Sequence, residues 1–405
     1  MPSGFQKITQ CIKNGEFKYL LNYAKNMGLR GSMKLFSVYC REYFGRKESV
    51  GLPSDKINVM LLPNGGLGDY VVIANYIYHF LKKYEDLPLH VTLVSKMKFL
   101  GPTKAIFETE SEHLIDEICD YEQHKYYEQY DLVMDISRFP VIVHSNPERI
   151  QSLGPELMEY VGLCEKFREE HKAIIDERPF LDGEGTRLCI DNRITRMQQP
   201  DLYHFLNVTE EYLYPIQMPD KDQVLSKFGI SGDYITIHRG CDTDYSKDST
   251  KLWPSEYYQT VIDWIKEKYP GLKIVQMGVS FSRCVTFENT DVNLIEKTSI
   301  DDLKVLLKYA KVHIDCEGGM VHLRHAVHGG PTVVIFGPTS VEFYRYSENE
   351  NISNHACPIW CEWASSTWID KCVKGHKNPP CMYSNPPEKV MEAVAKILGD
   401  PEQYE

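Results

Sequence analysis

The chain has 405 residues, of which 42% are hydrophobic and 25% are charged, as in ordinary globular proteins. This length suggests two or three domains. The formal net charge of −12 argues against a general nucleic-acid-binding protein, because contacts to phosphates need clustered positive charge. No apolar run approaches the ~20 residues that span a bilayer, and the N-terminus lacks the apolar core of a secretory signal. Twelve cysteines without an export signal indicate reduced thiols, so we expect a cytoplasmic protein rather than a disulfide scaffold.

The first 50 residues differ from the rest of the chain in charge. They contain nine Lys or Arg and three Glu, and their apolar residues recur at helical spacing. We therefore expect an N-terminal helical extension over residues 1–50. A basic amphipathic helix can lie on an anionic membrane surface, which would place the protein peripherally on the inner face of the membrane. The same helices can instead pack on the body of the protein with their cations in water, and both alternatives stay open.

From residue 57 onward, short apolar runs alternate with amphipathic segments. The runs predict strands at 57–62, 89–95, 131–136 and 186–191, and the spacing of apolar residues predicts a helix over 70–83. Strands that alternate with helices are typical of a parallel sheet covered on both faces. We therefore expect a first α/β domain over residues 51–220.

The same alternation restarts near residue 230. Predicted strands lie at 234–239, 272–278, 292–296, 312–316 and 331–337, and predicted helices at 254–269, 300–308 and 387–398. Ser299 is a suitable N-cap for the second of these helices. A polar stretch with two prolines at 215–230 is interpreted as the linker between domains. We expect a second α/β domain over 221–385, a final helical segment over 386–405, and a ligand site between the two domains.

A glycine-rich turn joins the first predicted strand to the first predicted helix. It contains Asn64, Gly65, Gly66 and Gly68, followed by Asp69 at the start of the helix. Glycines allow a sharp turn and close approach of a ligand, and free N–H groups at a helix start can bind an anion or a sugar oxygen. The alternative is a tight turn in which Asp69 only caps the helix or complements its dipole.

Two further motifs suit a diphosphate group. A strand ends at Asp315, and Gly318, Gly319 and His322 follow at the expected start of a helix, where backbone N–H groups and the helix dipole favour an anion. The second motif supplies cations that can neutralise a leaving diphosphate without a metal. Its residues are His238 and Arg239 at a strand end and Lys251 after a polar loop. The alternatives are a packed histidine on a helix face and solvated charges on a surface loop.

Four cysteines lie close together between residues 357 and 381, in a segment rich in Pro and Trp. Four thiolates in about 25 residues fit a closed tetrahedral site, for which zinc or iron is the usual occupant. His355 and His376 are possible replacements for one ligand, and the alternatives are four unrelated thiols or two reversible disulfides. The other eight cysteines are scattered and are expected to behave as small apolar residues. The four candidate ligands are Cys357, Cys361, Cys372 and Cys381.

Taken together, these residues resemble glycosyltransferase family 9, the heptosyltransferases. The resemblance runs in order over roughly residues 57–400 and is weakest between about 100 and 230. Two features depart from the family pattern. Glu317 stands where the family usually has a neutral residue before the glycine, and the cysteine cluster resembles only the subgroup that attaches heptose to autotransporter proteins and holds iron through four cysteines. The matching residues are Gly68-Asp69, Lys251 to Pro254, Met277-Gly278, Thr298 to Ile300, Asp315, Gly319, His322, Gly330-Pro331 and Phe336 to Thr339.

The resemblance implies a GT-B fold, with two Rossmann-like domains that have parallel sheets and face a central cleft. The first domain would bind the acceptor, the second would bind a nucleotide-sugar, and the last helix would cross back to the first domain. Asp69 would be the catalytic base of an inverting transfer that uses no catalytic metal. Acceptor contacts would come from Asn64, Gly65, Gly66 and Gly68. Donor contacts would come from His238, Arg239, Lys251, Met277, Gly278, Asp315, Gly318, Gly319 and His322.

The expected donor is ADP-heptose, and the expected acceptor is a hydroxyl of a surface glycan or of a lipopolysaccharide-type molecule. A protein acceptor is the first alternative. A nucleotide-sugar epimerase would release free sugar or an isomerised donor without any acceptor. A non-catalytic sugar- or nucleotide-binding protein would keep the glycines but would not depend on the carboxylate of Asp69.

Overall fold

The computed structural model describes residues 51–95, 99–109, 112–120, 127–177, 183–240, 249–279, 285–357, 360–365 and 368–399. The chain divides into two compact units, Met1–Leu52 and Pro53–Glu405, and the helices and strands of the described residues belong to the second unit. The expected helical extension over 1–50 lies outside the described residues. The domain boundaries expected from the sequence stay predictions.

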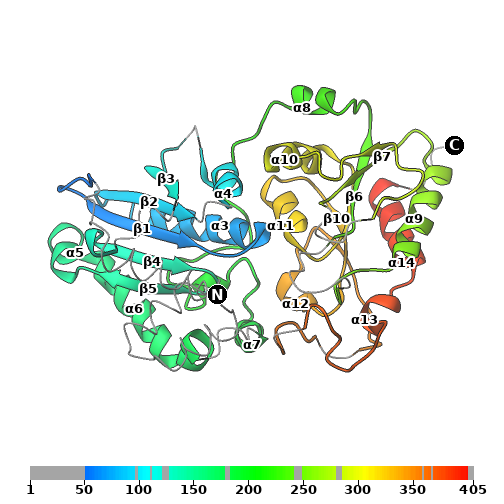
Figure 1. Ribbon diagram of the computed structural model, residues 1–405. Helices are drawn as coiled ribbons and strands as arrows, with labels where there is room; N and C mark the ends of the chain where they lie inside the picture. Colours follow the sequence, from blue (N-terminus) through cyan, green and yellow to red (C-terminus); the bar gives the residue numbers. More distant parts are fainter. Residues whose placement is uncertain are drawn as a thin grey trace, which may run out of the picture. The chain divides into compact units, whose positions relative to one another are not determined.

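The first half of the second unit is built on a five-stranded sheet (Figure 1). Its strands run in the order β3-β2-β1-β4-β5, and all neighbours are parallel except β4 and β5. The strands are β1 (Ile57–Pro63), β2 (Leu89–Ser95), β3 (Glu117–Asp120), β4 (Leu132–Ile136) and β5 (Pro140–Ser145). The helices are α3 (Leu67–Lys83), α4 (Leu100–Phe107), α5 (Pro147–Leu153), α6 (Glu156–Glu170) and α7 (Gly183–Asp191), with short turns η2 (Tyr127–Gln129), η3 (Ala173–Glu177) and η4 (Gln199–Asp201).

The second half is built on a six-stranded sheet in the order β11-β10-β9-β6-β7-β8, in which every pair is parallel. This is the strand order of a doubly wound dinucleotide-binding fold. The strands are β6 (Tyr234–His238), β7 (Lys273–Met277), β8 (Val292–Asn293), β9 (His313–Cys316), β10 (Thr332–Ile335) and β11 (Glu350–Ile352). The helices are α8 (Lys221–Lys227), α9 (Ser255–Lys268), α10 (Ile300–Tyr309), α11 (Gly319–Ala326), α12 (Val341–Tyr344), α13 (Pro380–Tyr383) and α14 (Pro387–Leu398).

Local sequence accounts for most of these elements. Every residue of β1 is buried, as expected for a continuous apolar run in the middle of a parallel sheet. Ser299 caps α10 as predicted: its hydroxyl accepts a hydrogen bond from the Asp302 N–H at 3.1 Å, while the Asp302 carboxylate accepts the Ser299 N–H at 2.9 Å. In each sheet the winding direction reverses beside the first strand, between β1 and β4 and between β6 and β9, which is where such folds bind ligands.

One predicted strand is wrong. Residues 186–191 are the last six residues of helix α7, in which Thr186 and Cys189 are buried three residues apart. The apolar run is too short for its length to distinguish a strand from a helix. Cys189 joins a small apolar cluster with Phe139, Phe167 and Phe343, so packing selects the helix.

The prediction that the last helix crosses back to the first domain is also wrong. The apolar face of α14, formed by Val390, Ala393 and Val394, packs into the core of the second sheet and against α9 (Figure 1). The residue before the helix explains why. Asn385 is fully buried, donates to the Phe336 carbonyl at 3.1 Å and accepts the indole N–H of Trp253 at 2.8 Å, so the chain is fixed to the second sheet before α14 begins.

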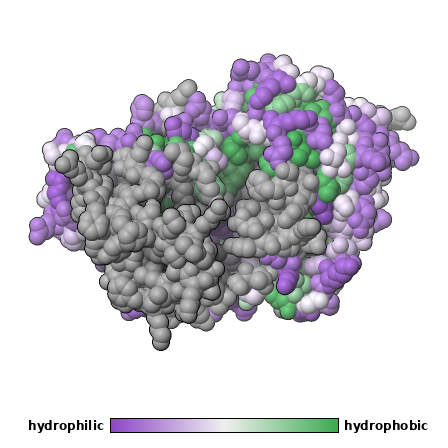
Figure 2. All heavy atoms as spheres, viewed as in Figure 1, coloured by the Kyte–Doolittle hydropathy of each residue, from purple (hydrophilic) through white to green (hydrophobic). Residues whose placement is uncertain are grey.

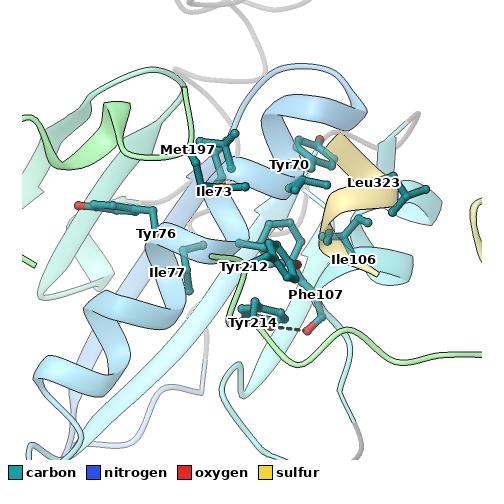
Figure 3. Close-up of a cluster of buried hydrophobic side chains, with 14 of the residues drawn as sticks. Tyr70, Ile73, Tyr76, Ile77, Ile106, Phe107, Met197, Tyr212, Tyr214 and Leu323 are labelled. Atoms are coloured by element: carbon teal, nitrogen blue, oxygen red, sulfur yellow. Dashed lines mark hydrogen bonds between the residues drawn. The ribbon is translucent and has the colours of Figure 1, made fainter. Parts of the chain in front are cut away.

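The segment that leads from the first sheet to the second is held against α3. The buried side chain of Asn75 donates to the carbonyls of Thr209 and Glu211 and accepts the Leu213 N–H at 2.8 Å. Figure 3 shows the neighbouring aromatic cluster, where the Tyr214 hydroxyl donates to the Phe107 carbonyl at 2.6 Å. The predicted linker over 215–230 therefore starts from an anchored segment and includes α8.

On the face that Figure 2 shows, polar residues form most of the visible surface of the described residues. Figure 2 shows hydrophilic residues along both margins of the view and apolar residues in smaller areas between them. Within the described part of the chain, no helix combines the length and the apolar character that crossing a membrane requires.

Candidate active site

The turn after β1 places Asp69 at the start of α3. Gly65 has a φ of 143°, a backbone conformation that residues other than glycine rarely adopt. Gly66 is the N-cap, and its N–H donates to Oδ2 of Asp69 at 2.7 Å. The carboxylate therefore closes the first turn of its own helix and complements the helix dipole. Asp69 has the capping role that the sequence left open, and its side chain is still 39% exposed.

The other carboxylate oxygen of Asp69 is bound by an arginine that sequence analysis did not single out. Nη2 of Arg196 lies 2.5 Å from Oδ1 of Asp69, and Nη1 of the same guanidinium lies 2.5 Å from Oε1 of Gln199. Arg196 is buried, with 5% of its surface exposed. It lies 127 residues beyond Asp69, in a stretch without regular periodicity, so no local pattern pointed to the pair.

The starts of α3 and α11 touch at two glycines. A Cβ atom on Gly68 would lie 2.6 Å from Cδ2 of His322 and 3.3 Å from Cα of Gly319. A Cβ atom on Gly319 would lie 3.1 Å from the backbone nitrogen of Gly68. Two motifs far apart in the sequence, one predicted to bind the acceptor and the other the diphosphate, therefore meet in one place. Both helices direct their N-terminal N–H groups and positive dipole ends to this region, which favours an anionic ligand there.

Glu317 supplies a negative charge beside this junction. Its side chain is buried and lies 2.6 Å from Nζ of Lys251 and 3.8 Å from Nε2 of His322. Burial alone would raise the pKa of Glu317, but the charge of Lys251 and the contact with His322 lower it to about 2. Two of the predicted donor-binding residues therefore already have a carboxylate partner within the chain.

His322 is oriented by a tyrosine that sequence analysis also missed. Nδ1 of His322 lies 2.5 Å from the hydroxyl of Tyr346, which is buried. The ring of His325 stacks on Tyr346 with 3.8 Å between centroids, and Nδ1 of His325 lies 2.6 Å from the carboxylate of Glu348. Burial raises the pKa of Tyr346 well above its ordinary value, so the phenol stays neutral and can donate or accept a hydrogen bond.

His238 and Asp315 lie at the ends of the neighbouring strands β6 and β9. Nδ1 of His238 lies 2.9 Å from both carboxylate oxygens of Asp315, and Nε2 of His313 lies 3.4 Å from Oδ2. Burial would raise the pKa of Asp315, but the charge and hydrogen bond of His238 lower it below its ordinary range. Burial lowers the pKa of His313, whose Nδ1 lies 2.9 Å from the Thr236 hydroxyl. The buried carboxylate thus fixes the ring of His238 at the strand end.

Three other predicted donor-binding residues have structural contacts. Nε of Arg239 donates to the Trp253 carbonyl at 2.9 Å and so holds the segment that carries Lys251. Met277 is fully buried at the end of β7. Gly278 follows with a φ of 150°, and its carbonyl accepts the Glu296 N–H at 2.9 Å.

The four clustered cysteines are free, half-buried thiols. Burial, followed by the charges of the other three cysteines, raises the pKa of Cys381 to about 12. Burial, followed by the charges of Cys372, Cys357 and Glu362, raises the pKa of Cys361 to about 11. Among the described residues, no three His, Cys, Asp or Glu side chains have the arrangement of a metal site. The segment is tied to the donor motifs, because the Cys361 N–H donates to the Pro338 carbonyl and the Thr250 N–H to the Ile369 carbonyl, both at 2.8 Å.

Of the eight other cysteines, four lie among the described residues. These four are buried, as expected for small apolar side chains. They are Cys119, Cys164, Cys189 and Cys316.

Several solved structures with similar folds are glycosyltransferases. A family 9 glycosyltransferase from Veillonella parvula DSM 2008 is 16% identical with a TM-score of 0.52, covering 86% of this chain and 99% of that one. The ADP-heptose lipopolysaccharide heptosyltransferase II of E. coli is 13% identical with a TM-score of 0.52, covering 85% and 99%. The iron-containing dodecameric glycosyltransferase TibC from enterotoxigenic E. coli H10407 is 12% identical with a TM-score of 0.53, covering 87% and 78%. These likenesses show the GT-B fold.

The sequence identifies the family directly. No curated protein matches the chain. The family model of glycosyltransferase family 9 (heptosyltransferase) matches residues 160–366, slightly more than half of the chain. The chain belongs to glycosyltransferase family 9.

Proposed function

We propose that the protein transfers heptose or a similar sugar from a nucleoside diphosphate sugar, ADP-heptose in the first instance, to a hydroxyl of a surface glycan or lipopolysaccharide-type acceptor. Family membership supports the reaction class. ADP-heptose is suggested by the heptosyltransferase II of similar fold, whose name specifies that donor. The observation that supports the proposal most directly is the contact of Gly68 with Gly319 and His322, because it brings the turn that carries Asp69 to the predicted diphosphate site.

In this proposal Asp69 is the general base. The acceptor hydroxyl gives its proton to the Asp69 carboxylate while the oxygen attacks the anomeric carbon, and the bond from that carbon to the diphosphate breaks on the opposite face. The configuration is therefore inverted, through a transition state of oxocarbenium character. Each carboxylate oxygen has two lone pairs, so an acceptor hydroxyl can bind Asp69 while Gly66 and Arg196 remain bound.

The leaving diphosphate would be stabilised by the start of α11, Lys251 and His322. Preorganised N–H groups and cations stabilise the charge that develops on a leaving group, so the scheme uses no catalytic divalent metal. Lys251 and His322 now contact Glu317, so a donor diphosphate would take over part of the interaction that the carboxylate makes.

The test compares the wild-type protein with the Asp69→Asn variant. We expect ADP-heptose to raise the melting temperature of both, because a ligand that binds the folded state stabilises it. Turnover should fall at least about a hundredfold in the variant, the usual contribution of a general base. Asp86→Asn makes the same chemical change at an exposed aspartate and should leave turnover unchanged.

Two outcomes would contradict this proposal. Turnover that persists in Asp69→Asn would remove the carboxylate from the reaction. Consumption of the donor at the full rate without any acceptor would favour an epimerase.

The four-cysteine segment is proposed to hold a structural zinc or iron ion. Four thiolates are a donor set that both metals accept, and the four cysteines lie within about 25 residues of the chain. The similar fold of an iron-containing heptosyltransferase favours iron. When bound, the ion would cross-link residues 357–381 and stabilise the fold.

Elemental analysis of the purified protein should find about one metal ion per chain, the content of a single closed site. Cys372→Ser should lose the ion and melt at a lower temperature. A metal-free protein of unchanged stability would contradict the proposal. Iron would also strengthen the case for the alternative acceptor, a protein hydroxyl.

A further inference from the structure

Arg196 is a buried cation whose position is fixed from several sides. Its guanidinium contacts the Asp69 carboxylate and the buried side-chain oxygen of Gln199, each at 2.5 Å. Its backbone N–H donates to the Phe343 carbonyl of α12 at 2.7 Å. A charged group removed from water is costly unless it is paired, so the ion pair with Asp69 accounts for the burial of this arginine.

The segment around Arg196 is shaped to hold the side chain in this place. Arg193 adopts a left-handed conformation with a φ of 58°, and the Thr195 N–H donates to the side-chain oxygen of Gln198 at 3.3 Å. The backbone N–H of Arg196 also binds the Phe343 carbonyl of α12, and its charge opposes the burial-driven rise in the pKa of Tyr346, the hydrogen-bond partner of His322. Arg196 is thus tied to elements of both sheets.

We propose that Arg196 is a positioning residue that holds the Asp69 carboxylate in the orientation needed to accept the acceptor proton. With Gly66 on Oδ2 and Arg196 on Oδ1, rotation of the carboxylate is restricted, and the remaining lone pairs keep fixed directions. A base held in the productive geometry avoids reorganisation during the reaction. The inference rests on the proposed function, since it requires Asp69 to be the base.

The competing explanation is that Asp69 only neutralises a structural arginine. The two explanations differ in what a free guanidinium ion can restore. A truncated side chain leaves a cavity beside Asp69 that a guanidinium ion fits, because the ion has the planar donors of the arginine head group. It can restore the orientation of the carboxylate. It cannot restore the connection that the arginine side chain makes between the 193–199 segment and Asp69.

The experiment measures sugar transfer by Arg196→Ala, with and without millimolar guanidinium chloride. We expect kcat to fall about a hundredfold while the KM for the donor changes by less than about threefold, since misplacing a catalytic group affects the chemical step. Guanidinium should recover at least about a tenth of the lost rate, and tetramethylammonium chloride at the same concentration should not, because it cannot donate hydrogen bonds. Arg196→Lys keeps the charge without the planar fork and should have intermediate activity.

Arg187→Ala is the matched control, because it removes an arginine from an exposed ion pair with Asp191 and should leave kcat unchanged. Unchanged kcat in Arg196→Ala would overturn the inference, and so would a loss that matches the fraction of unfolded protein measured by circular dichroism and that guanidinium does not reverse.

Asp69→Asn distinguishes failure of this inference from failure of the proposed function. If Asp69→Asn retains turnover, the proposed function fails, whereas if only Arg196→Ala retains it, this inference alone fails.

Discussion

At the residue scale, Glu317 is one of the two features by which this chain departs from the pattern that the resemblance implies. Its charge lies beside the start of α11, where the proposal requires a diphosphate, and it contacts Lys251 and His322, both of which the diphosphate would use. A carboxylate that holds Lys251 and His322 in place keeps the site ordered before the donor arrives, at the cost of competing with the donor for both partners.

We therefore predict that Glu317→Gln binds ADP more tightly than the wild-type protein. The variant keeps the size of the side chain and removes its charge, so Lys251 and His322 become available to the diphosphate. Isothermal titration should show a Kd about tenfold lower, equivalent to about 1.4 kcal/mol. Glu350→Gln, which removes one partner of the separate Lys396 ion pair, should leave the Kd unchanged. An unchanged or higher Kd in Glu317→Gln would mean that Glu317 supports nucleotide binding.

At the element scale, the contact between α3 and α11 depends on Gly68 and Gly319. Their lack of side chains brings the N-termini of two helices from different sheets within van der Waals distance. Close backbone approach of this kind, rather than a need for unusual backbone angles, explains why glycine occupies both positions, since neither has a positive φ.

Gly68→Ala should separate these helices. The added methyl group would overlap His322 and the backbone of Gly319, and overpacking of this kind costs about 1–3 kcal/mol. We expect a lower free energy of unfolding together with a loss of turnover that exceeds the loss of folded protein, measured by urea titration and activity assay. Gly162→Ala is the matched control, because that glycine lies in α6 with open space around it and alanine should raise helix stability by up to ~1 kcal/mol. If Gly68→Ala kept the same turnover per folded molecule as Gly162→Ala, the helix contact would have no role in catalysis.

At the scale of the whole molecule, the sequence predicts elements that are determined locally. Strand β2 and helix α14 have the predicted bounds, because apolar residues at every second position and a regular i, i+4 pattern each specify one structure. The run at 186–191 fits a strand or a helix, and only its packing against Phe167 and Phe343 decides between them.

The candidate site was predictable in part, for a related physical reason. Gly68, Asp69, Gly319 and His322 lie in the first turns of helices that follow recognisable strands, so the topology of a doubly wound fold brings them to ligand-binding positions. Arg196 lies in an irregular segment and acquires its role through a contact with a residue distant in sequence. The periodicity and spacing of residues in the sequence do not indicate such a pair. The path of the chain after Asn385 likewise depends on buried hydrogen bonds to Phe336 and Trp253.

The central claim is that one site contains both the Asp69 carboxylate and the diphosphate of a bound nucleotide-sugar. The most direct test is a crystal structure of the protein with an unreactive donor analogue, such as ADP-2-deoxy-2-fluoro-heptose. We predict that the diphosphate lies at the start of α11 with Lys251 beside it. The anomeric carbon should lie roughly 6 Å from the Asp69 carboxylate, the span of one hydrogen bond and one attack distance. An anomeric carbon too far from Asp69 for an acceptor hydroxyl to bridge the gap would contradict the account.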